Sequence, residues 1–212
     1  MWRSSAPSGC RRRCAISTRF AGWRPSTVRR AGLTHRRDGP LHPHDSVRLT
    51  ALKLSNVETF IASGNASFEA PEHDAATLER RIERGLAASL RYEVRTYIRT
   101  TSELAAVAAH APFDDPGVSL HVGFLKDEPT AEAIERVMRL TTATDAFHLR
   151  GREFWWRTMT KLSESKVTGA ALERALGTPT TMRNINTVRR LAAKYRPEST
   201  SLSPSARPTS SA

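Results

Sequence analysis

The chain has 212 residues, 39% of them hydrophobic and 25% charged, with a formal net charge of +12 and a pI near 10.9. This composition is ordinary for a globular protein, and no apolar run approaches the roughly 20 residues of a membrane-spanning helix. The N-terminus also lacks the continuous apolar stretch of a secretory signal, so we expect a cytoplasmic protein of one large or two small domains.

Residues 1–44 differ from the rest of the chain in charge and in pattern. They contain ten Arg, no Lys and one acidic residue, a net charge of +9, whereas residues 45–212 hold 23 basic and 20 acidic residues, a net charge of +3. A segment so rich in Arg, Ser, Gly and Pro cannot bury enough apolar surface to offset its chain entropy, so we expect disorder. Three origins fit: a transit peptide, a basic arm for nucleic acid or anionic lipid, and a shifted reading frame or early start site, which the Lys-free composition favours.

Both cysteines, Cys10 and Cys14, fall in this segment. A zinc site needs two further ligands at suitable spacing, and the neighbouring histidines show no finger pattern. We therefore expect no metal site. At the other end, residues 197–212 form a Ser/Thr/Pro tail for which we also expect disorder.

Residues 45–196 have the patterning of one α+β domain. Two short strand-like runs, Val57–Ile61 and Ala66–Phe68, come first. Asp74 is a good N-cap for a following helix, whose apolar stripe is Leu78, Ile82 and Leu86. The alternation over Tyr92–Ile98 then predicts a half-buried strand.

The second half of this domain mixes helices and strands without strict βαβ alternation. Thr100 and Glu103 form a capping box before a helix, whose inward residues are Leu104, Val107 and Ala108. A strand over Ser119–Leu125 precedes a helix from about Thr130, with inward residues Ile134, Val137 and Met138.

A hairpin and two helices complete the predicted domain. The runs Ala146–Leu149 and Glu153–Arg157 flank an Arg-Gly-Arg turn. One helix covers Lys166–Leu176, stopped by Gly177. The last covers about Asn184–Tyr195, with a buried stripe of Ile185, Val188, Leu191 and Ala192.

Four segments, in this order and at this spacing, carry a family resemblance: NVETFIASGNASF, HVGFL, GREFWW and TMRNINTVRRLA. Over about residues 51–195 the chain resembles the bacterial domain-of-unknown-function family 1697. The resemblance implies mixed or antiparallel sheets with packed helices in ferredoxin-like α/β units, and no assigned activity. Members of that family open with a strand and an Arg-Gly-Ile-Asn-type loop. Residues 1–44 show no match to either, so we expect an unpaired sheet edge here.

The short polar run Ser63-Gly64-Asn65 interrupts the first pair of strands. One interpretation is turn chemistry, in which Gly64 takes a positive φ and Asn65 tolerates the left-handed region and bonds local backbone. The other is an anion-binding concavity built from Ser63 and the amides of Gly64 and Asn65. A nucleophilic Ser63 is disfavoured, because no Gly-x-Ser-x-Gly elbow surrounds it.

The second polar run begins the last helix, at Arg183, Asn184, Asn186 and Thr187. Asn184 is a natural N-cap, and the first-turn amides of a helix attract anions, with the Arg183 guanidinium beside them. In the alternative interpretation Asn184 only caps, Asn186 and Thr187 face solvent or a neighbouring loop, and Arg183 pairs with an acid.

Two other features have a structural explanation as their first interpretation. Trp155 and Trp156 are expected on opposite faces of a strand, one in the core and the other packed on a helix or exposed to stack a ligand. The basic residues at the end of the last helix, Arg189, Arg190, Lys194 and Arg196, complement the helix dipole as a solvated face.

The leading hypothesis is a binding protein for a small anionic or phosphorylated ligand, held between the Ser63–Asn65 turn and the helix start near Asn184. Its cofactor, catalytic residues and oligomeric state are unknown from the sequence. Weak nucleic-acid binding through the basic N-terminal arm and the last helix is an alternative. An enzyme, hydrolase or transferase, is a third, although no acid/base pair stands out.

Overall fold

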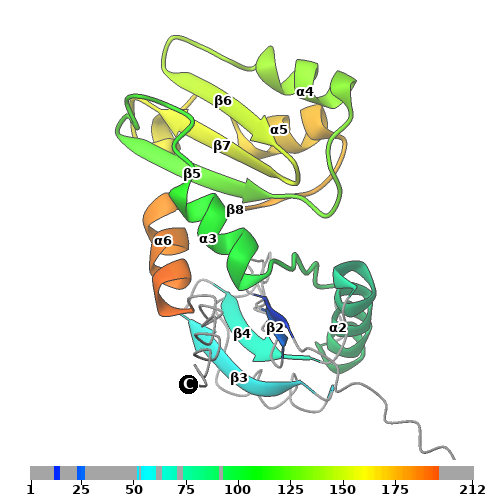
Figure 1. The fold of residues 1–212 in the computed structure, drawn as a ribbon. Helices are drawn as coiled ribbons and strands as arrows, with labels where there is room; N and C mark the ends of the chain where they lie inside the picture. The colour runs from blue at the N-terminus through cyan, green and yellow to red at the C-terminus, as the bar shows by residue number, and fades with distance from the viewer. Residues whose placement is uncertain are drawn as a thin grey trace, which may run out of the picture.

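The structure is a computed structural model that describes residues 12–14, 23–26, 52, 54–60, 64–70, 74–90 and 93–195 (Figure 1). The tail 197–212 and most of residues 1–44 lie outside the described residues, so their disorder stays a prediction. Two short antiparallel strands are described in the N-terminal segment, β1 (Arg12–Cys14) and β2 (Trp23–Ser26), where the sequence predicted none.

The first part of the domain is a hairpin and a long helix. Strands β3 (Ser55–Phe60) and β4 (Asn65–Glu69) pair antiparallel, and α2 (Ala75–Leu90) follows. The Asp74 carboxylate caps α2, because it accepts the amide of Thr77 at 2.8 Å. The predicted stripe is confirmed, since three α2 side chains are fully buried: Leu78, Ile82 and Leu86.

Helix α3 (Thr101–Ala109) starts with the predicted capping box. Thr100 Oγ1 accepts the Glu103 amide at 2.8 Å, and Glu103 Oε2 accepts the Thr100 amide at 2.5 Å. These reciprocal bonds fix where the helix begins.

The second part is a four-stranded antiparallel sheet in the order β6-β7-β5-β8. In chain order its elements are β5 (Ser119–Phe124), α4 (Ala131–Met138), β6 (Asp145–Arg150), β7 (Glu153–Thr158), the short 3-10 helix η1 (Leu162–Glu164), α5 (Gly169–Leu176), β8 (Thr181–Asn184) and α6 (Ile185–Lys194). Gly177, with φ of 72°, caps α5 in the left-handed conformation as predicted.

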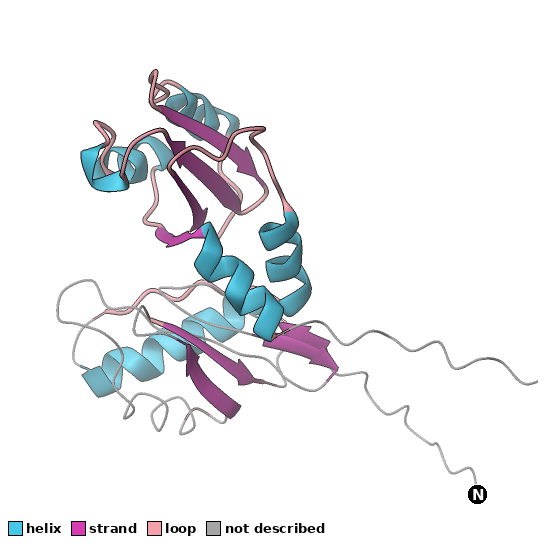
Figure 2. Cartoon of the chain, turned by 90° about the vertical axis from the view of Figure 1, so that its left-hand side faces the viewer, coloured by secondary structure: helices cyan, strands magenta, loops and turns pink. Residues whose placement is uncertain are grey.

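Two hydrophobic clusters cover the two faces of this sheet. Helices α3 and α6 lie between it and the β3–β4 hairpin (Figures 1 and 2), so one cluster joins Trp155 and Val122 to Phe68 and Leu78. The other cluster joins Trp156 to α4 and α5. Both tryptophans are 1% exposed. They lie on opposite faces as expected, and neither is exposed for a ligand.

The α+β class is confirmed, but three local predictions are wrong. Met138 is 45% exposed, because Ala133 and Val137 form the buried face of the two-turn helix α4. Helix α5 begins at Gly169 instead of Lys166, because Thr168 Oγ1 caps it by accepting the Ala171 amide. The sequence analysis also missed β8, whose pairing with β5 is non-local.

The predicted half-buried strand Tyr92–Ile98 is also wrong. Tyr92 lies outside the described residues, and residues 93–99 are extended without forming a strand. The amides of Thr96 and Ile98 donate to Glu83 Oε1 and Glu79 Oε1 of α2, each at 2.6 Å. Side-chain carboxylates thus accept the bonds that a neighbouring strand would accept. The segment is buried on both sides only from Thr96 to Arg99, since Glu93 and Arg95 are exposed.

Candidate functional site

The structure brings the two polar motifs into direct contact. Arg183 Nε, on β8, donates to Asn65 Oδ1 at 2.8 Å, and Arg183 Nη2 lies 3.4 Å from the carbonyl oxygen of Gly64. Asn65 is fully buried and Arg183 half-buried. The turn therefore lies beside β8, the unpredicted strand that leads directly into α6, and we call this contact the Asn65–Arg183 junction.

Arg183 is held at the junction by neutral acceptors. Its Nη1 also donates to Thr181 Oγ1 at 3.0 Å and to the Met182 carbonyl at 2.7 Å. With Asn65 and Gly64, these bonds use most of the five donors of a guanidinium. An amide oxygen, a hydroxyl and two carbonyls orient the group, and the acid that one interpretation paired with Arg183 is not among these four acceptors.

The Gly64–Asn65 side of the junction has the backbone conformation of a tight turn. Gly64 has φ of 74°, whereas Asn65 starts β4 and does not take the left-handed conformation. The Asn65 Nδ2 instead donates to the Phe60 carbonyl at 3.4 Å, across the end of the hairpin. Ser63 lies outside the described residues, so its predicted part in an anion site stays a prediction.

The start of α6 carries the other predicted residues. Asn184 is the N-cap, and its Oδ1 accepts the Asn186 amide at 2.9 Å. The Asn186 side chain is exposed and Thr187 is half-buried. Asn184 therefore does what a cap requires, while Asn186 is open to solvent and Thr187 is partly so.

The basic residues at the end of α6 lie mainly on an exposed face, as predicted. Lys194 Nζ pairs with Glu58 Oε2 at 2.9 Å, and Arg190 stacks over Phe60 at 5.7 Å from its ring centroid. Arg189 is exposed. Arg196 lies outside the described residues.

A second charged region, which the sequence analysis missed, is centred on Arg99. This side chain is 0% exposed and forms an ion pair with Glu153 at the start of β7. Its other nitrogens donate to three carbonyls at 2.7 to 2.9 Å, those of Ile98, Leu125 and Arg152. The sequence signal that could have revealed this region is an Arg that directly follows the apolar residues Tyr97 and Ile98, because a buried charge requires a partner.

Glu79 lies in the same region and is 3% exposed. Burial raises the pKa of Glu79 to about 7 from an ordinary 4.5, while the hydrogen bond from Ile98 and the charges of Lys126, Arg99 and Arg152 oppose that rise. The carboxyl group therefore changes charge near neutral pH inside the protein.

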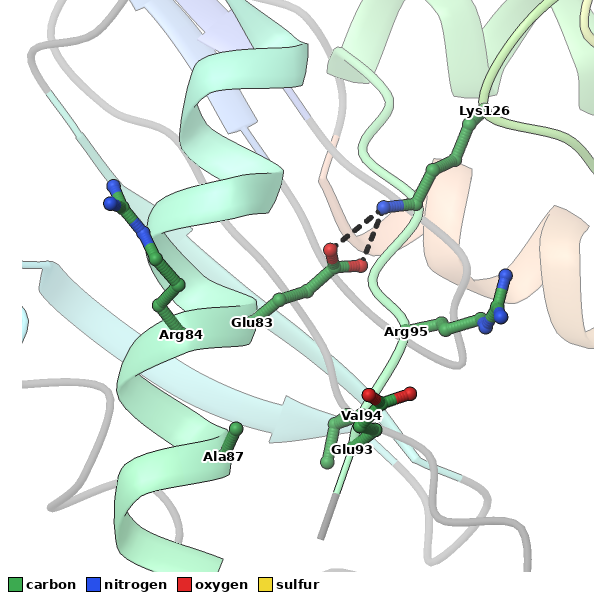
Figure 3. A pocket seen from close by; sticks show the side chains of 7 residues that line it. All are labelled: Glu83, Arg84, Ala87, Glu93, Val94, Arg95 and Lys126. Atoms are coloured by element: carbon green, nitrogen blue, oxygen red, sulfur yellow. Dashed lines mark hydrogen bonds and ion pairs between the residues drawn. The ribbon is translucent and has the colours of Figure 1, made fainter.

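A cavity of about 300 Å³ opens between α2, the segment 93–95 and Lys126 (Figure 3). Lys126 Nζ reaches Glu83 Oε1 at 2.7 Å and Oε2 at 2.8 Å. Because Glu83 Oε1 also accepts the Thr96 amide, this carboxylate links both Lys126 and Thr96 to α2. The pair is therefore not free for a ligand. A second cavity, of about 400 Å³, lies at the end of α5 beside Gly177 and Pro179. Neither cavity is lined by a predicted site residue.

The described part of the chain contains neither a larger cluster of metal-ligating side chains nor a helix that could span a membrane. There, no group of three or more His, Cys, Asp or Glu side chains is placed to hold a metal ion. None of the described helices combines the length and the apolar character that crossing a membrane requires.

Comparisons with known proteins agree with this fold. Among curated proteins, none matches the chain. The chain is similar to the solved structure of a conserved bacterial protein from Streptococcus pneumoniae, with a TM-score of 0.59 and 19% sequence identity. The match covers 76% of this chain and 92% of that chain. At this identity the likeness concerns the fold alone.

A family model matches residues 47–155, just over half of the chain. The family is described as a protein of unknown function, DUF1697, and the match includes the β3–β4 hairpin, β5 and the start of β7. The chain therefore belongs to this family of proteins of unknown function.

Proposed function

We propose that the protein binds a small anionic or phosphorylated ligand on the surface where the Gly64–Asn65 turn meets the start of α6. The observation that carries the proposal is the contact of Arg183 with Asn65, which holds a guanidinium beside a helix N-terminus. First-turn amides and the helix dipole favour negative charge there, and Arg adds a charged donor.

Each predicted residue has a distinct role in this proposal. Arg183 supplies the charge, and Asn186 and Thr187 offer polar contacts from the exposed side of α6. Asn65 and Asn184 act through position, because one orients the guanidinium and the other caps the helix. Ser63 would add a hydroxyl donor from the turn.

The proposal is tested by titrating the protein with inorganic phosphate and pyrophosphate, followed by calorimetry and amide NMR shifts. Because a hydrogen bond to a charged group contributes about 1.5–3 kcal/mol, we expect Arg183→Gln to weaken binding roughly 10- to 100-fold. Asn186→Ala should weaken it less. Arg189→Ala, an exposed arginine of the same helix, is the matched control and should leave affinity unchanged.

Two results contradict the proposal. One is equal anion affinity in the native protein and in an Arg183→Gln, Asn186→Ala double variant that remains folded. The other is a loss in Arg189→Ala as large as the loss in Arg183→Gln, because general surface charge would then account for the binding.

Weak nucleic-acid binding through the N-terminal arm and α6 is the second candidate. The exposed Arg189 and Arg190 favour it, whereas the pairing of Lys194 with Glu58 reduces the charge that α6 offers. The expected signature is a steep salt dependence that shrinks when residues 1–44 are removed. An affinity that stays constant between low and moderate salt rejects this candidate.

The remaining expectations are also kept as proposals: a bacterial and cytoplasmic protein, and ferredoxin-like units. The β-α-β-β-α-β order of β5 to β8 supports the last of these.

A further inference from the structure

Two histidines that no predicted motif contains meet between α3 and the sheet. His110 is the C-cap of α3, and His148 lies on β6. Their Nε2 atoms are 3.2 Å apart, and the centroids of the two rings are 5.1 Å apart. Both side chains are half-buried, so the pair keeps a solvent-accessible side.

The spacing of these nitrogens matches one edge of a metal coordination shell. With metal–nitrogen bonds of about 2.0–2.1 Å, two ligands of a tetrahedral ion lie about 3.3 Å apart, and two ligands at a right angle about 2.9 Å apart. The observed 3.2 Å falls between these values. We propose that His110 and His148 form a bidentate site for a divalent transition-metal ion that prefers imidazole, such as Ni²⁺, Cu²⁺ or Zn²⁺, bound through both Nε2 atoms and completed by water or an external ligand.

The surroundings hold both rings in place. Trp155 packs edge-on against each imidazole, with ring centroids 4.6 Å from His110 and 5.7 Å from His148. It is 1% exposed and forms a rigid wall behind the pair. The Trp155 Nε1 is buried without a hydrogen-bond partner among the described residues, so no competing bond draws this ring away. Because a site that is rigid before binding spends less entropy on ordering, this wall favours metal binding.

Arg150 determines which nitrogen of His110 carries the proton without metal. Its Nη1 lies 3.4 Å from His110 Nδ1. An arginine only donates, so Nδ1 accepts, and Nε2–H of His110 then donates to Nε2 of His148. On metal binding the Nε2–H bond breaks, the proton moves through solvent to Nδ1, and the Nε2 lone pair bonds the ion. No net proton is released, but the new Nδ1–H faces the Arg150 donor, so Arg150 weakens the site.

The test is a titration of the full-length protein with Ni²⁺ alone at pH 7.5, where unperturbed imidazole is mostly neutral. Calorimetry measures affinity, and tryptophan fluorescence reports proximity, because Trp155 contacts both ligands. The variants are His110→Gln, His148→Gln, Arg150→Gln and Trp155→Phe. The matched control is His121→Gln, a half-buried histidine of β5 bonded to Ser119 and outside the pair. All variants keep Cys10, Cys14 and the N-terminal histidines, so binding by that segment is common to all.

In the native protein we expect saturable quenching from one Ni²⁺ at the His110–His148 pair, in addition to any ion that the N-terminal segment binds. His110→Gln and His148→Gln should each weaken binding at least 10-fold, and His121→Gln should not change it. Arg150→Gln should strengthen it about threefold, because it removes a charge and offers Nδ1–H an acceptor. Trp155→Phe should lose the quenching and keep the calorimetric binding.

Thermal melting establishes that each variant is folded. If only one of the two histidine variants folds, that variant alone is enough to test the inference. Native affinity in both folded histidine variants overturns the inference, since the ion then binds elsewhere. Absence of Ni²⁺ binding at millimolar concentration overturns it as well.

Discussion

Arg99 is fully buried and Arg183 is half-buried, and the two arginines have different surroundings. Arg99 is 0% exposed and its charge is balanced by the Glu153 carboxylate, whereas Arg183 is half-buried and held by an amide, a hydroxyl and two carbonyls. The first arrangement is an internal ion pair that connects distant segments of the chain. The second holds a half-buried guanidinium through at least four neutral acceptors, at the segment that leads into α6. The degree of burial and the kind of named partner thus distinguish a structural arginine from a candidate binding arginine.

The largest expected effect on stability comes from removing the Arg99–Glu153 ion pair. Arg99→Ala leaves the Glu153 carboxylate and three carbonyls without their donor, so we expect the free energy of unfolding to fall by about 3–5 kcal/mol. Chemical denaturation measures the change, with exposed Arg189→Ala as the control. A loss below about 1 kcal/mol would break the contrast between the two arginines.

The next effect concerns the charge of Glu79 in the Arg99 region. Because burial raises the pKa of Glu79 to about 7 from 4.5, the folded protein binds more protons than the unfolded chain between these pH values. Stability from this group is therefore fully present below pH 4.5 and is lost as pH rises through 7, by on the order of 3 kcal/mol.

Glu79→Gln keeps an acceptor for the Ile98 amide and removes the titration. We expect its unfolding free energy to change less between pH 5 and pH 8 than that of the native protein, with the variant more stable at pH 8. Parallel pH profiles for the two proteins would show that Glu79 titrates normally.

A smaller effect is expected at Arg183. Arg183→Ala removes bonds to neutral acceptors, one of them on the buried Asn65, so we expect a stability loss of about 1–3 kcal/mol. The measurement is denaturation beside Arg99→Ala under the same conditions. If Arg183→Ala loses as much unfolding free energy as Arg99→Ala or more, Arg183 has mainly a structural role. The argument for a ligand at Arg183 is then removed.

The smallest effect is at the surface pair of Lys194 with Glu58, in which both side chains are 46% exposed. Lys194→Ala should cost about 0.2–1 kcal/mol, and the cost should shrink at high salt because exposed pairs are screened. A loss that persists unchanged in 1 M salt would instead point to the contact of the Lys194 ammonium group with the Phe60 ring.

The sequence by itself determined the elements whose cause is local. Asp74, the Thr100–Glu103 box and Gly177 set helix ends through bonds to backbone only a few residues away, and the stripes of α2 and α6 follow helical periodicity. The two polar motifs of the candidate site stood out for the same reason, because each interrupts an apolar pattern.

The tertiary structure alone decided what depends on distant partners. Strand β8 exists through its pairing with β5, and residues 93–99 are extended without a strand because carboxylates of α2 accept their amides. Arg99 finds Glu153, Arg183 finds Asn65, and His110 meets His148 across separations that leave no periodic trace in the sequence. Local patterns report which backbone conformation a segment prefers, whereas the partner of a buried charge is set by how the segments pack.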